Sequence, residues 1–335
     1  MKITICGGGS LGHVCMGVLS QCADVELSLL TKRPEQWSTA IKVTDVAGKK
    51  YVGRLHRISS SAADVIPEAD IVLFCLPGFL IEDTLLQIKP HLSARTIVGT
   101  IVSSTGFFFV AHGLLPANTP LFGFQRVPYI ARVADYGKSA NLLGYKSSLA
   151  IACEHIEDTE TFCATIARLF ATPTTLLNSY LEVALTNSNP ILHTGRLYSL
   201  WHDWDGNPYD RCLLFYKEWT VDASEWLIRM DAEFKSLLTR LPMDPDSIPS
   251  LLDYYESHDA VSLTAKLQSI KAFEKIAAPM KELPAGGWIP DFDSRYFTED
   301  FPYGLRYIVD LAHEYNLETP NIDKVYEWGM NLQNS

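Results

Sequence analysis

The chain has 335 residues, of which 47% are hydrophobic and 20% are charged, and its formal net charge is −11. This length favours two domains, and the composition is typical of folded cores rather than disorder. The negative charge, without any basic run, argues against a nucleic-acid partner. The N-terminus lacks a signal-peptide pattern, and the most apolar stretch, 96–115, is interrupted by serine, threonine and glycine residues. We therefore expect no membrane span.

Seven cysteines are dispersed along the chain. None forms a C-x-x-C pair, and no group of cysteines and histidines has the spacing of a zinc site. We therefore expect free thiols, no metal site and a cytoplasmic location, since free thiols are typical of reducing compartments.

A glycine motif begins almost at the N-terminus. An apolar run leads into Gly7, Gly9 and Gly12 in the spacing G-x-G-x-x-G, and a helix-compatible run follows. In a dinucleotide-binding turn the first glycine makes the turn, the second admits the pyrophosphate, and the third allows close packing of helix and strand. The N–H groups at the start of the helix, at Ser10 and Leu11, would then face the phosphates.

The strand expected at 25–31 ends in Thr31-Lys32-Arg33. An NAD site usually carries a carboxylate at this point, about 20 residues after the glycines, to bind the ribose 2′-hydroxyl. Two cations and a hydroxyl stand here instead, which favours a 2′-phosphate and therefore NADP, with NAD as the alternative. Lys32 and Arg33 are equally compatible with solvated loop charges.

Further apolar runs predict buried strands at 71–76 and 96–102. They end in Pro77-Gly78 and in a small polar loop that starts at Ser103. Because ligands collect at the carboxyl ends of strands in open α/β sheets, we expect Pro77 and Ser103 to contact the cofactor. The remaining elements expected in this half are strands at 121–125 and 146–152 and a helix at 158–170. The sequence thus predicts an α/β Rossmann domain with a doubly wound, mainly parallel sheet over residues 1–178, followed by an all-α domain over 179–335.

A long helix is expected at 181–201, with Pro190 as a kink within it. Its polar residues recur at spacings of three and four and would share one face. They are Glu182, Thr186, Asn189, His193 and Arg196. Such a face is either solvent-exposed or lines a cleft, and His193 taken alone is compatible with both interpretations.

The segment 293–304 follows a loop rich in glycine and proline and leads into a helix expected from Pro302 to about 315. Asp300 fits a helix N-cap, and Arg295 fits a surface charge. The functional alternatives are that Arg295 binds a carboxylate and that Asp300 orients a histidine.

The whole chain resembles the opine dehydrogenases, the octopine/nopaline dehydrogenase group. Three stretches carry the resemblance: G-G-G-S-L-G at 7–12, N-P-I-L-H-T-G at 189–195 and R-Y-F-T-E-D-F-P-Y-G at 295–304. The resemblance implies a Rossmann domain, a helical domain and an active site in the cleft between them.

The resemblance also implies an activity. A 2-oxo acid and an amine, usually from an amino acid, form an imine, and NAD(P)H reduces it to an N-(carboxyalkyl)amino acid. The family's catalytic histidine matches His193, its carboxylate partner matches Asp300, and its substrate-carboxylate arginine matches Arg295. A shorter match relates Gln125 to a glutamine near the nicotinamide. Asn189, within the second motif, is a further candidate for substrate binding.

The expected partners are small molecules, and a homodimer is a compatible assembly. The amino acid, the oxo acid and the physiological direction stay open. Two other functions are compatible with the glycine motif alone. One is a carbonyl reductase of the ketopantoate reductase or 3-hydroxyacyl-CoA dehydrogenase type. The other is a nucleotide-sensing module without catalysis.

Overall fold

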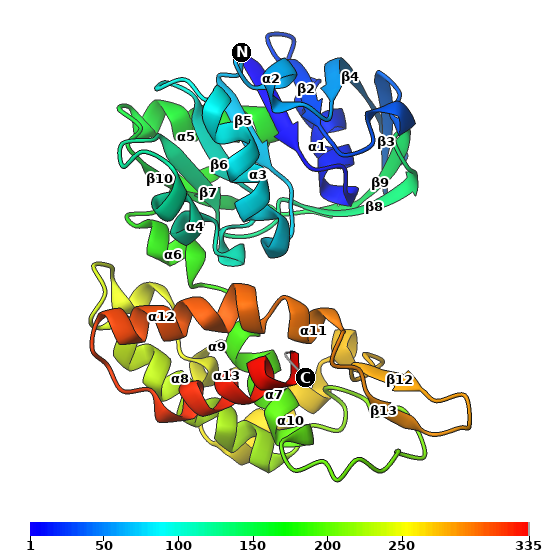
Figure 1. The fold of residues 1–335 in the computed structure, drawn as a ribbon, viewed down its shortest axis with the longest axis vertical. Helices are drawn as coiled ribbons and strands as arrows, with labels where there is room; N and C mark the ends of the chain where they lie inside the picture. The colour runs from blue at the N-terminus through cyan, green and yellow to red at the C-terminus, as the bar shows by residue number, and fades with distance from the viewer. Residues whose placement is uncertain (334–335) are drawn as a thin grey trace. The chain divides into compact units, whose positions relative to one another are not determined.

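The computed structural model describes residues 1–333, which form two compact units (Figure 1). The first unit covers Met1–Thr186, and the second begins at Asn187. The division falls after helix α6 (Tyr180–Ala184), so it lies beyond residue 178, where the sequence placed the change of pattern. In residues 1–333, no helix combines the length and the apolar character needed to cross a membrane.

The first unit is built on an eleven-stranded sheet in the order β11-β10-β7-β6-β5-β1-β2-β4-β3-β9-β8. Its strands are β1 (Lys2–Cys6), β2 (Glu26–Leu30), β3 (Ala40–Asp45), β4 (Lys50–Ser59), β5 (Ile71–Phe74), β6 (Ile97–Thr100), β7 (Leu121–Phe124), β8 (Tyr129–Asp135), β9 (Ser139–Tyr145), β10 (Leu149–Glu154) and β11 (Thr174–Leu176). The run from β7 through β1 to β4 is parallel, whereas β10 with β7, β3 with β4, and β8 with β9 are antiparallel. The strand order reverses between β1 and β5, which is the point where doubly wound sheets bind nucleotides. The predicted Rossmann fold is confirmed.

Helices cover both faces of this sheet (Figure 1). One face packs against α1 (Ser10–Leu19) and α5 (Thr159–Phe170), and the other against α2 (Ala62–Val65), α3 (Ile81–Ile88) and α4 (Phe107–Leu114). The sequence of β5 is apolar throughout because both of its faces are buried. Leu73 packs into the core beneath α1 and α5, and Val72 and Phe74 pack into the core beneath α2, α3 and α4. A strand buried on both faces needs no polar alternation.

The hairpin β8–β9 lies at the outer end of the sheet and was not predicted from the sequence. It joins the sheet through β3, and it also packs against α1. Two side chains of α1 accept hydrogen bonds from its main chain: the Val133 N–H donates to Ser10 Oγ at 3.1 Å, and the Gly137 N–H donates to His13 Nε2 at 2.9 Å. The hairpin therefore holds the start of the helix that follows the glycine motif.

The second unit is helical, as predicted, with one small antiparallel pair of strands, β12 (Met280–Glu282) and β13 (Trp288–Pro290). Helix α7 packs against α8, α13 and the π-helical segment η7. The elements are α7 (Asn189–Trp201), α8 (Val221–Leu238), α9 (Leu251–Tyr254), α10 (Ala260–Ser269), α11 (Arg295–Thr298), η7 (Phe301–Leu305), α12 (Arg306–Glu314) and α13 (Pro320–Gln333). Short 3₁₀ turns lie at Pro34–Gln36, Gly78–Leu80, Lys89–His91, Ser103–Thr105, Pro245–Ser247 and Lys271–Phe273.

The prediction of one long helix at 181–201 is wrong. The chain forms two helices, α6 and α7, and Pro190 lies in the first turn of α7 rather than at a kink. Proline fits that position because the first N–H groups of a helix have no intrahelical acceptor. The Thr186 carbonyl accepts a hydrogen bond from Arg126 Nη2 at 3.0 Å instead of from a helical N–H. The predicted face of five polar residues is therefore also wrong, since Glu182 and Thr186 are not on α7.

Candidate active site

The glycine motif forms the turn between β1 and α1, and each glycine has the surroundings that its expected role requires. Gly7 has φ +123°, a conformation that side chains disfavour, and a Cβ there would lie 2.5 Å from the Cys75 carbonyl oxygen. A Cβ on Gly12 would lie 2.1 Å from the Gly7 carbonyl oxygen, so helix and strand pack closely. At Gly9 nothing lies within 4 Å of that position. The main chain is thus open there to a phosphate.

The start of α1 completes the turn. Ser10 and Leu11 are the first residues of the helix, so their N–H groups have no helical acceptor and are suited to an anion. The Ser10 hydroxyl accepts from Val133 N–H, which leaves its own hydrogen free to donate.

A hollow of about 510 Å³ opens beside the glycine turn. Its lining combines the turn with the end of β2 and the end of β4: Gly7, Gly8, Thr31, Lys32, Arg33 and Ser60. Thr31 is buried, whereas Lys32 and Arg33 are exposed. Asp83 also lines this hollow, so its charge is mixed. The turn, the open main chain at Gly9 and this hollow together fit the phosphate and adenosine portions of a dinucleotide.

The two other residues predicted to contact the cofactor, Pro77 and Ser103, differ in how exposed they are. Pro77 is partly exposed and lies in the loop after Phe74, the last residue of β5, and β5 neighbours β1 in the sheet. Ser103 is fully buried, and its hydroxyl donates to the Phe124 carbonyl at 2.9 Å. The Ser103 side chain is therefore engaged inside the protein.

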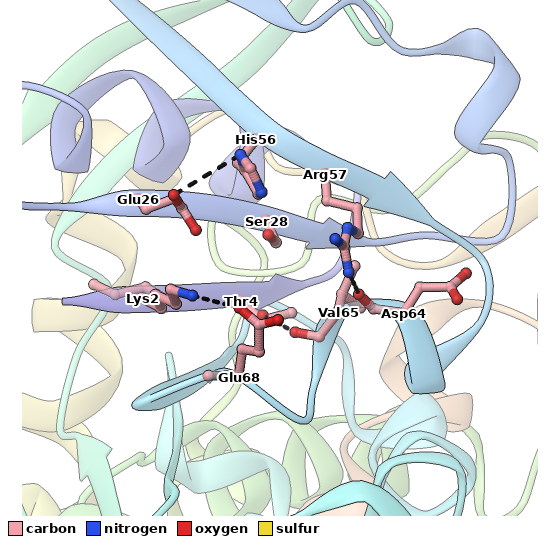
Figure 2. Close-up of a pocket in the computed structure, with 11 residues that line it drawn as sticks. Lys2, Thr4, Glu26, Ser28, His56, Arg57, Asp64, Val65 and Glu68 are labelled. Atoms are coloured by element: carbon pink, nitrogen blue, oxygen red, sulfur yellow. Dashed lines mark hydrogen bonds and ion pairs between the residues drawn. The ribbon is translucent and has the colours of Figure 1, made fainter.

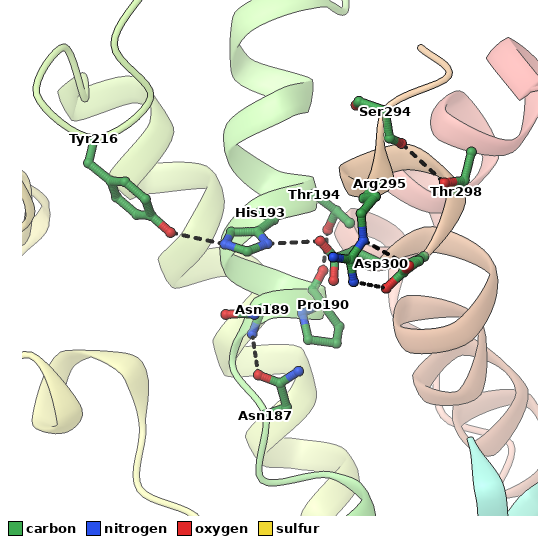
Figure 3. Close-up of polar contacts among 11 residues, drawn as sticks. Asn187, Asn189, Pro190, His193, Thr194, Tyr216, Ser294, Arg295, Thr298 and Asp300 are labelled. Carbon is green, nitrogen blue, oxygen red and sulfur yellow. Dashed lines mark hydrogen bonds and ion pairs between the residues drawn. The ribbon is translucent and has the colours of Figure 1, made fainter. Parts of the chain in front are cut away.

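In the second unit, His193 and Asp300 meet although 107 positions separate them in the sequence. His193 Nδ1 lies 2.8 Å from Asp300 Oδ2, and both side chains are only slightly exposed (Figure 3). Asp300 stands before η7, but its side chain makes no capping bond there, because it is directed at the histidine. The contact of Asp300 therefore agrees with a role as orienting partner of a histidine and not with a role as helix N-cap.

Tyr216 occupies the other side of the same imidazole ring. Its hydroxyl lies 2.9 Å from His193 Nε2, opposite Asp300 (Figure 3). Burial raises the pKa of the Tyr216 phenol, so the hydroxyl keeps its proton at neutral pH. The Tyr296 ring packs on the imidazole with centroids 4.8 Å apart. Neither tyrosine was predicted. Tyr296 falls within the third motif, but Tyr216 belongs to no motif and the sequence contains no signal for it.

Arg196 explains how the segment that carries Tyr216 is held. The Arg196 side chain is 1% exposed, and its guanidinium donates to the carbonyls of Phe215 (3.2 Å) and Glu218 (2.6 Å). It also donates to Thr220 Oγ1 at 3.4 Å and lies over the Trp219 ring. Burial lowers its pKa to about 10, which still leaves it charged at neutral pH. Arg196 therefore shares with His193 the side of α7 that contacts this segment.

Arg295 forms an ion pair with Glu299 one turn later on the chain. Its Nε and Nη2 donate to the two carboxylate oxygens at 2.9 and 2.8 Å, and its side chain is 82% exposed. The hydrogen bonds that Arg295 donates to Glu299 raise the pKa of Arg295. This pairing leaves Nη1 as the guanidinium nitrogen without a bond to Glu299.

The last two predicted substrate residues are Asn189 and Gln125. Asn189 begins α7, and its N–H donates to Asn187 Oδ1 at 3.2 Å (Figure 3). Gln125 follows β7 in the first unit, where its N–H donates to the Ala150 carbonyl and its side chain is partly exposed. The predicted site residues thus fall into two groups, the cofactor residues with Gln125 in the first unit and the others in the second.

A different depression lies over the opposite, amino ends of β1 and β2 (Figure 2). Its volume is about 20 Å³, on the order of what one water needs. Several of its polar side chains already contact one another, Lys2 with Glu68 and His56 with Glu26. This depression is therefore no candidate for a substrate site. Among residues 1–333, no group of three or more histidine, cysteine, aspartate or glutamate side chains is arranged to hold a metal ion.

Two family models match the chain. Residues 176–333 match the alpha-helical domain of the NAD/NADP octopine/nopaline dehydrogenases, and residues 3–106 match the ketopantoate reductase PanE/ApbA model. The ketopantoate reductase match lies within the nucleotide-binding unit. His193, Tyr216 and Asp300 lie within the octopine/nopaline dehydrogenase match. A simple carbonyl reductase is therefore the less supported alternative.

Relatives of known activity align along nearly the entire chain. The opine dehydrogenase of Haliotis discus hannai is 27% identical, over 98% of this chain and 89% of that protein. The tauropine dehydrogenase of Arabella iricolor is 26% identical, over 98% of this chain and 91% of that protein. A solved structure of octopine dehydrogenase with NADH and L-arginine has the same fold, with a TM-score of 0.90 and 24% identity over 100% of this chain and 90% of that one.

A Rossmann unit joined to a helical unit that carries a paired histidine and aspartate defines a class, the two-domain NAD(P)-dependent dehydrogenases. Within that class, the helical domain of this chain belongs to the octopine/nopaline dehydrogenase family, and the chain along nearly its entire length is similar to opine dehydrogenases, which are oxidoreductases acting on CH–NH bonds.

Proposed function

We propose that this protein catalyses the NAD(P)H-dependent reductive condensation of an amino acid with a 2-oxo acid, through an imine, to an N-(carboxyalkyl)amino acid. The observation that carries the proposal is the His193–Asp300 pair, because imine formation requires a group that both takes up and releases protons near neutral pH. Loss of water from the carbinolamine needs a proton donor, and generation of the free amine needs a proton acceptor. An imidazole serves both needs.

The chain's own residues have separate tasks in this proposal. Asp300 accepts the Nδ1 hydrogen of His193, which fixes the tautomer and stabilises the imidazolium. The first unit binds the cofactor through the glycine turn, with Pro77 at the carboxyl end of β5 as a further contact. The cofactor supplies the hydride, and the protein supplies position and proton transfer.

Arg295 is proposed to bind a substrate carboxylate, with Asn189 and Gln125 as further substrate contacts. The exposure of the Arg295 guanidinium and its Nη1, which is not bonded to Glu299, support this role. Arg295→Ala should raise the KM of the oxo acid or the amino acid much more than it changes the Kd of the cofactor. A change confined to cofactor affinity would remove Arg295 from substrate binding.

We further propose a preference for NADP over NAD. The support is the hollow beside the glycine turn, where Thr31, Lys32 and Arg33 offer a hydroxyl and two cations, with Ser60 close by. Titration of the protein with NADPH and with NADH, followed by intrinsic tryptophan fluorescence, tests the preference directly. In the double variant Lys32→Ala/Arg33→Ala, the Kd of NADPH should rise by at least tenfold while that of NADH changes little. Equal losses for both cofactors would contradict the proposal.

The experiment that tests the reaction is a matrix of amino acids against 2-oxo acids, with oxidation of NADPH and NADH followed at 340 nm and the product identified by mass spectrometry. Turnover that depends on both substrates, with a secondary amine as product, is the expected result. Turnover of the oxo acid without any amine would instead support a carbonyl reductase. In the same assay, His193→Ala should lower kcat by about 10² to 10⁴ while cofactor binding persists.

The cellular location and the oligomeric state of the protein stay predictions. A cytoplasmic location agrees with the seven cysteines, all of which are free thiols. Assembly into a homodimer is tested by light scattering of the purified protein.

A further inference from the structure

Both ring nitrogens of His193 already have partners within the protein. Asp300 is a carboxylate and only accepts, so Nδ1 carries the hydrogen and donates it to Oδ2. Nε2 then holds a lone pair, and Tyr216 is the group that can donate to it, at 2.9 Å. A proton that travels between this imidazole and a substrate must therefore pass through the phenol oxygen or displace it.

Displacement of the Tyr216 ring would be costly, because the ring is held on several sides. It stacks on Trp219 with an interplanar angle of 10° and on Phe273 at a centroid distance of 4.3 Å. The flanking main chain is fixed by Arg196 through the carbonyls of Phe215 and Glu218. Rigid placement of a neutral hydroxyl at hydrogen-bond distance favours transfer through it.

We propose that Tyr216 relays protons between His193 Nε2 and the reacting substrate atoms, so that Asp300, His193 and Tyr216 form one proton-transfer chain. This inference rests on the proposed function, since it assigns a path to the protons of that reaction.

The steps balance without any further reactant. When the amine is generated, the substrate ammonium gives a proton to the Tyr216 oxygen, and the phenol hydrogen passes to Nε2. When the carbinolamine loses water, its C–O bond breaks and the oxygen takes the phenol hydrogen, while the nitrogen lone pair forms the C=N bond. The imidazolium then returns its Nε2 hydrogen to the Tyr216 oxygen. Tyr216 is neutral at the end of each step, in agreement with its raised pKa.

The surroundings of the imidazole are otherwise compatible with this path. The polar groups that face it are Asp300, Tyr216 and Tyr296, and the apolar Phe215 ring lies edge-on to it at a centroid distance of 5.7 Å. The Arg295–Glu299 ion pair belongs to the same segment as Asp300. Tyr296 contacts the ring by its own ring, and its pKa is raised by burial, so it stays neutral as well.

The test is the substitution Tyr216→Phe in the full-length protein. Phenylalanine keeps the ring that stacks on Trp219 and Phe273, so the fold should persist, and Tyr216→Met removes the same hydroxyl if the first variant does not fold. The matched control is Tyr129→Phe, which removes a buried tyrosine hydroxyl that lies 3.4 Å from the Phe170 carbonyl in the first unit.

Two measurements are needed. The first is ¹⁵N NMR of histidine-labelled protein, in which loss of the hydroxyl should move the His193 Nε2 resonance to higher frequency because an unprotonated nitrogen loses its donor. The second is kcat with saturating cofactor and substrates, which should fall by about 10² to 10³ while the Kd of the cofactor stays within twofold. Tyr129→Phe should change neither quantity.

An unchanged Nε2 resonance overturns the proposal, because the hydroxyl would then not be bonded to the imidazole. A shifted resonance with undiminished kcat also overturns it, since protons would then reach Nε2 by another path. Absence of amine-dependent turnover in the wild-type protein is a different result: it contradicts the proposed reaction, while the NMR measurement still reports on the contact.

Discussion

Replacement of Arg196 by methionine should destabilise the second unit and disturb the histidine site at once. Methionine is close to arginine in length and fills the apolar part of the space, but it donates no hydrogen bond. The carbonyls of Phe215 and Glu218 would lose their donor inside the protein. Each buried group left without a partner costs about 1–3 kcal/mol.

Part of this loss is offset, because the variant no longer buries a cation. The same burial already lowers the pKa of Arg196 to about 10, which is a direct sign of that cost. We therefore expect a net loss of about 2–4 kcal/mol in the free energy of unfolding of this unit. For a domain of this size that corresponds to a fall in Tm of roughly 5–15 °C.

Differential scanning calorimetry of the wild-type protein and of Arg196→Met measures this loss. The control is Arg306→Met, because Arg306 is exposed on α12 and pairs with exposed Asp310 at 3.4 Å. Such a surface pair contributes about 0–1 kcal/mol. If Arg196→Met and Arg306→Met were equally stable, the hydrogen bonds of Arg196 would not support the segment that carries Tyr216, and our account of its position would be refuted.

Three further outcomes are expected. Asp300→Asn should lower kcat by about 10² or more with little change in the Kd of the cofactor, because an amide cannot stabilise the His193 imidazolium; stopped-flow and steady-state kinetics would contradict this if kcat stayed the same. Gly8→Ala should raise the Kd of the cofactor and lower Tm, because the new Cβ would lie 2.8 Å from the Trp37 ring; titration showing wild-type affinity would oppose it. Burial lowers the pKa of His13 below its ordinary value of 6.5, so its stabilising contribution is complete above about pH 6.5 and is lost as the pH falls. Denaturant unfolding from pH 5 to pH 8 should show this loss in the wild type but not in His13→Gln, and parallel curves would disprove it.

The parts of the protein that could be predicted from the sequence are those in which cause and effect are close together along the chain. The glycine turn is such a case, since Gly7, Gly9 and Gly12 act on a strand and a helix that adjoin them. The strands β5 and β7 are also such cases, because burial on both faces leaves a continuous apolar run. Sequence periodicity alone could not bring His193 and Asp300 together, and only the family resemblance suggested their pairing.

The failures have identifiable physical reasons. Pro190 fits the first turn of a helix as well as a kink, so the periodicity of 181–201 concealed a break between two helices. The strands β8 and β9 carry large apolar side chains on their exposed side as well, among them Ile130, Leu143 and Tyr145, so no alternation of apolar and polar residues marked them. Tyr216 could not be predicted, because its position depends on a guanidinium twenty residues earlier and on the packing of an irregular segment.

The hairpin β8–β9 bears on how this protein could be shortened. Its main chain donates hydrogen bonds to Ser10 and His13. The position of the helix start that follows the glycine turn therefore depends on residues more than 120 positions later in the chain. A fragment cut directly after β7 would contain the whole glycine motif and the parallel core strands from β7 to β4. It would nevertheless leave the Ser10 hydroxyl and the His13 imidazole without those donors. A minimal nucleotide-binding fragment of this chain must therefore extend at least through Tyr145, the last residue of β9.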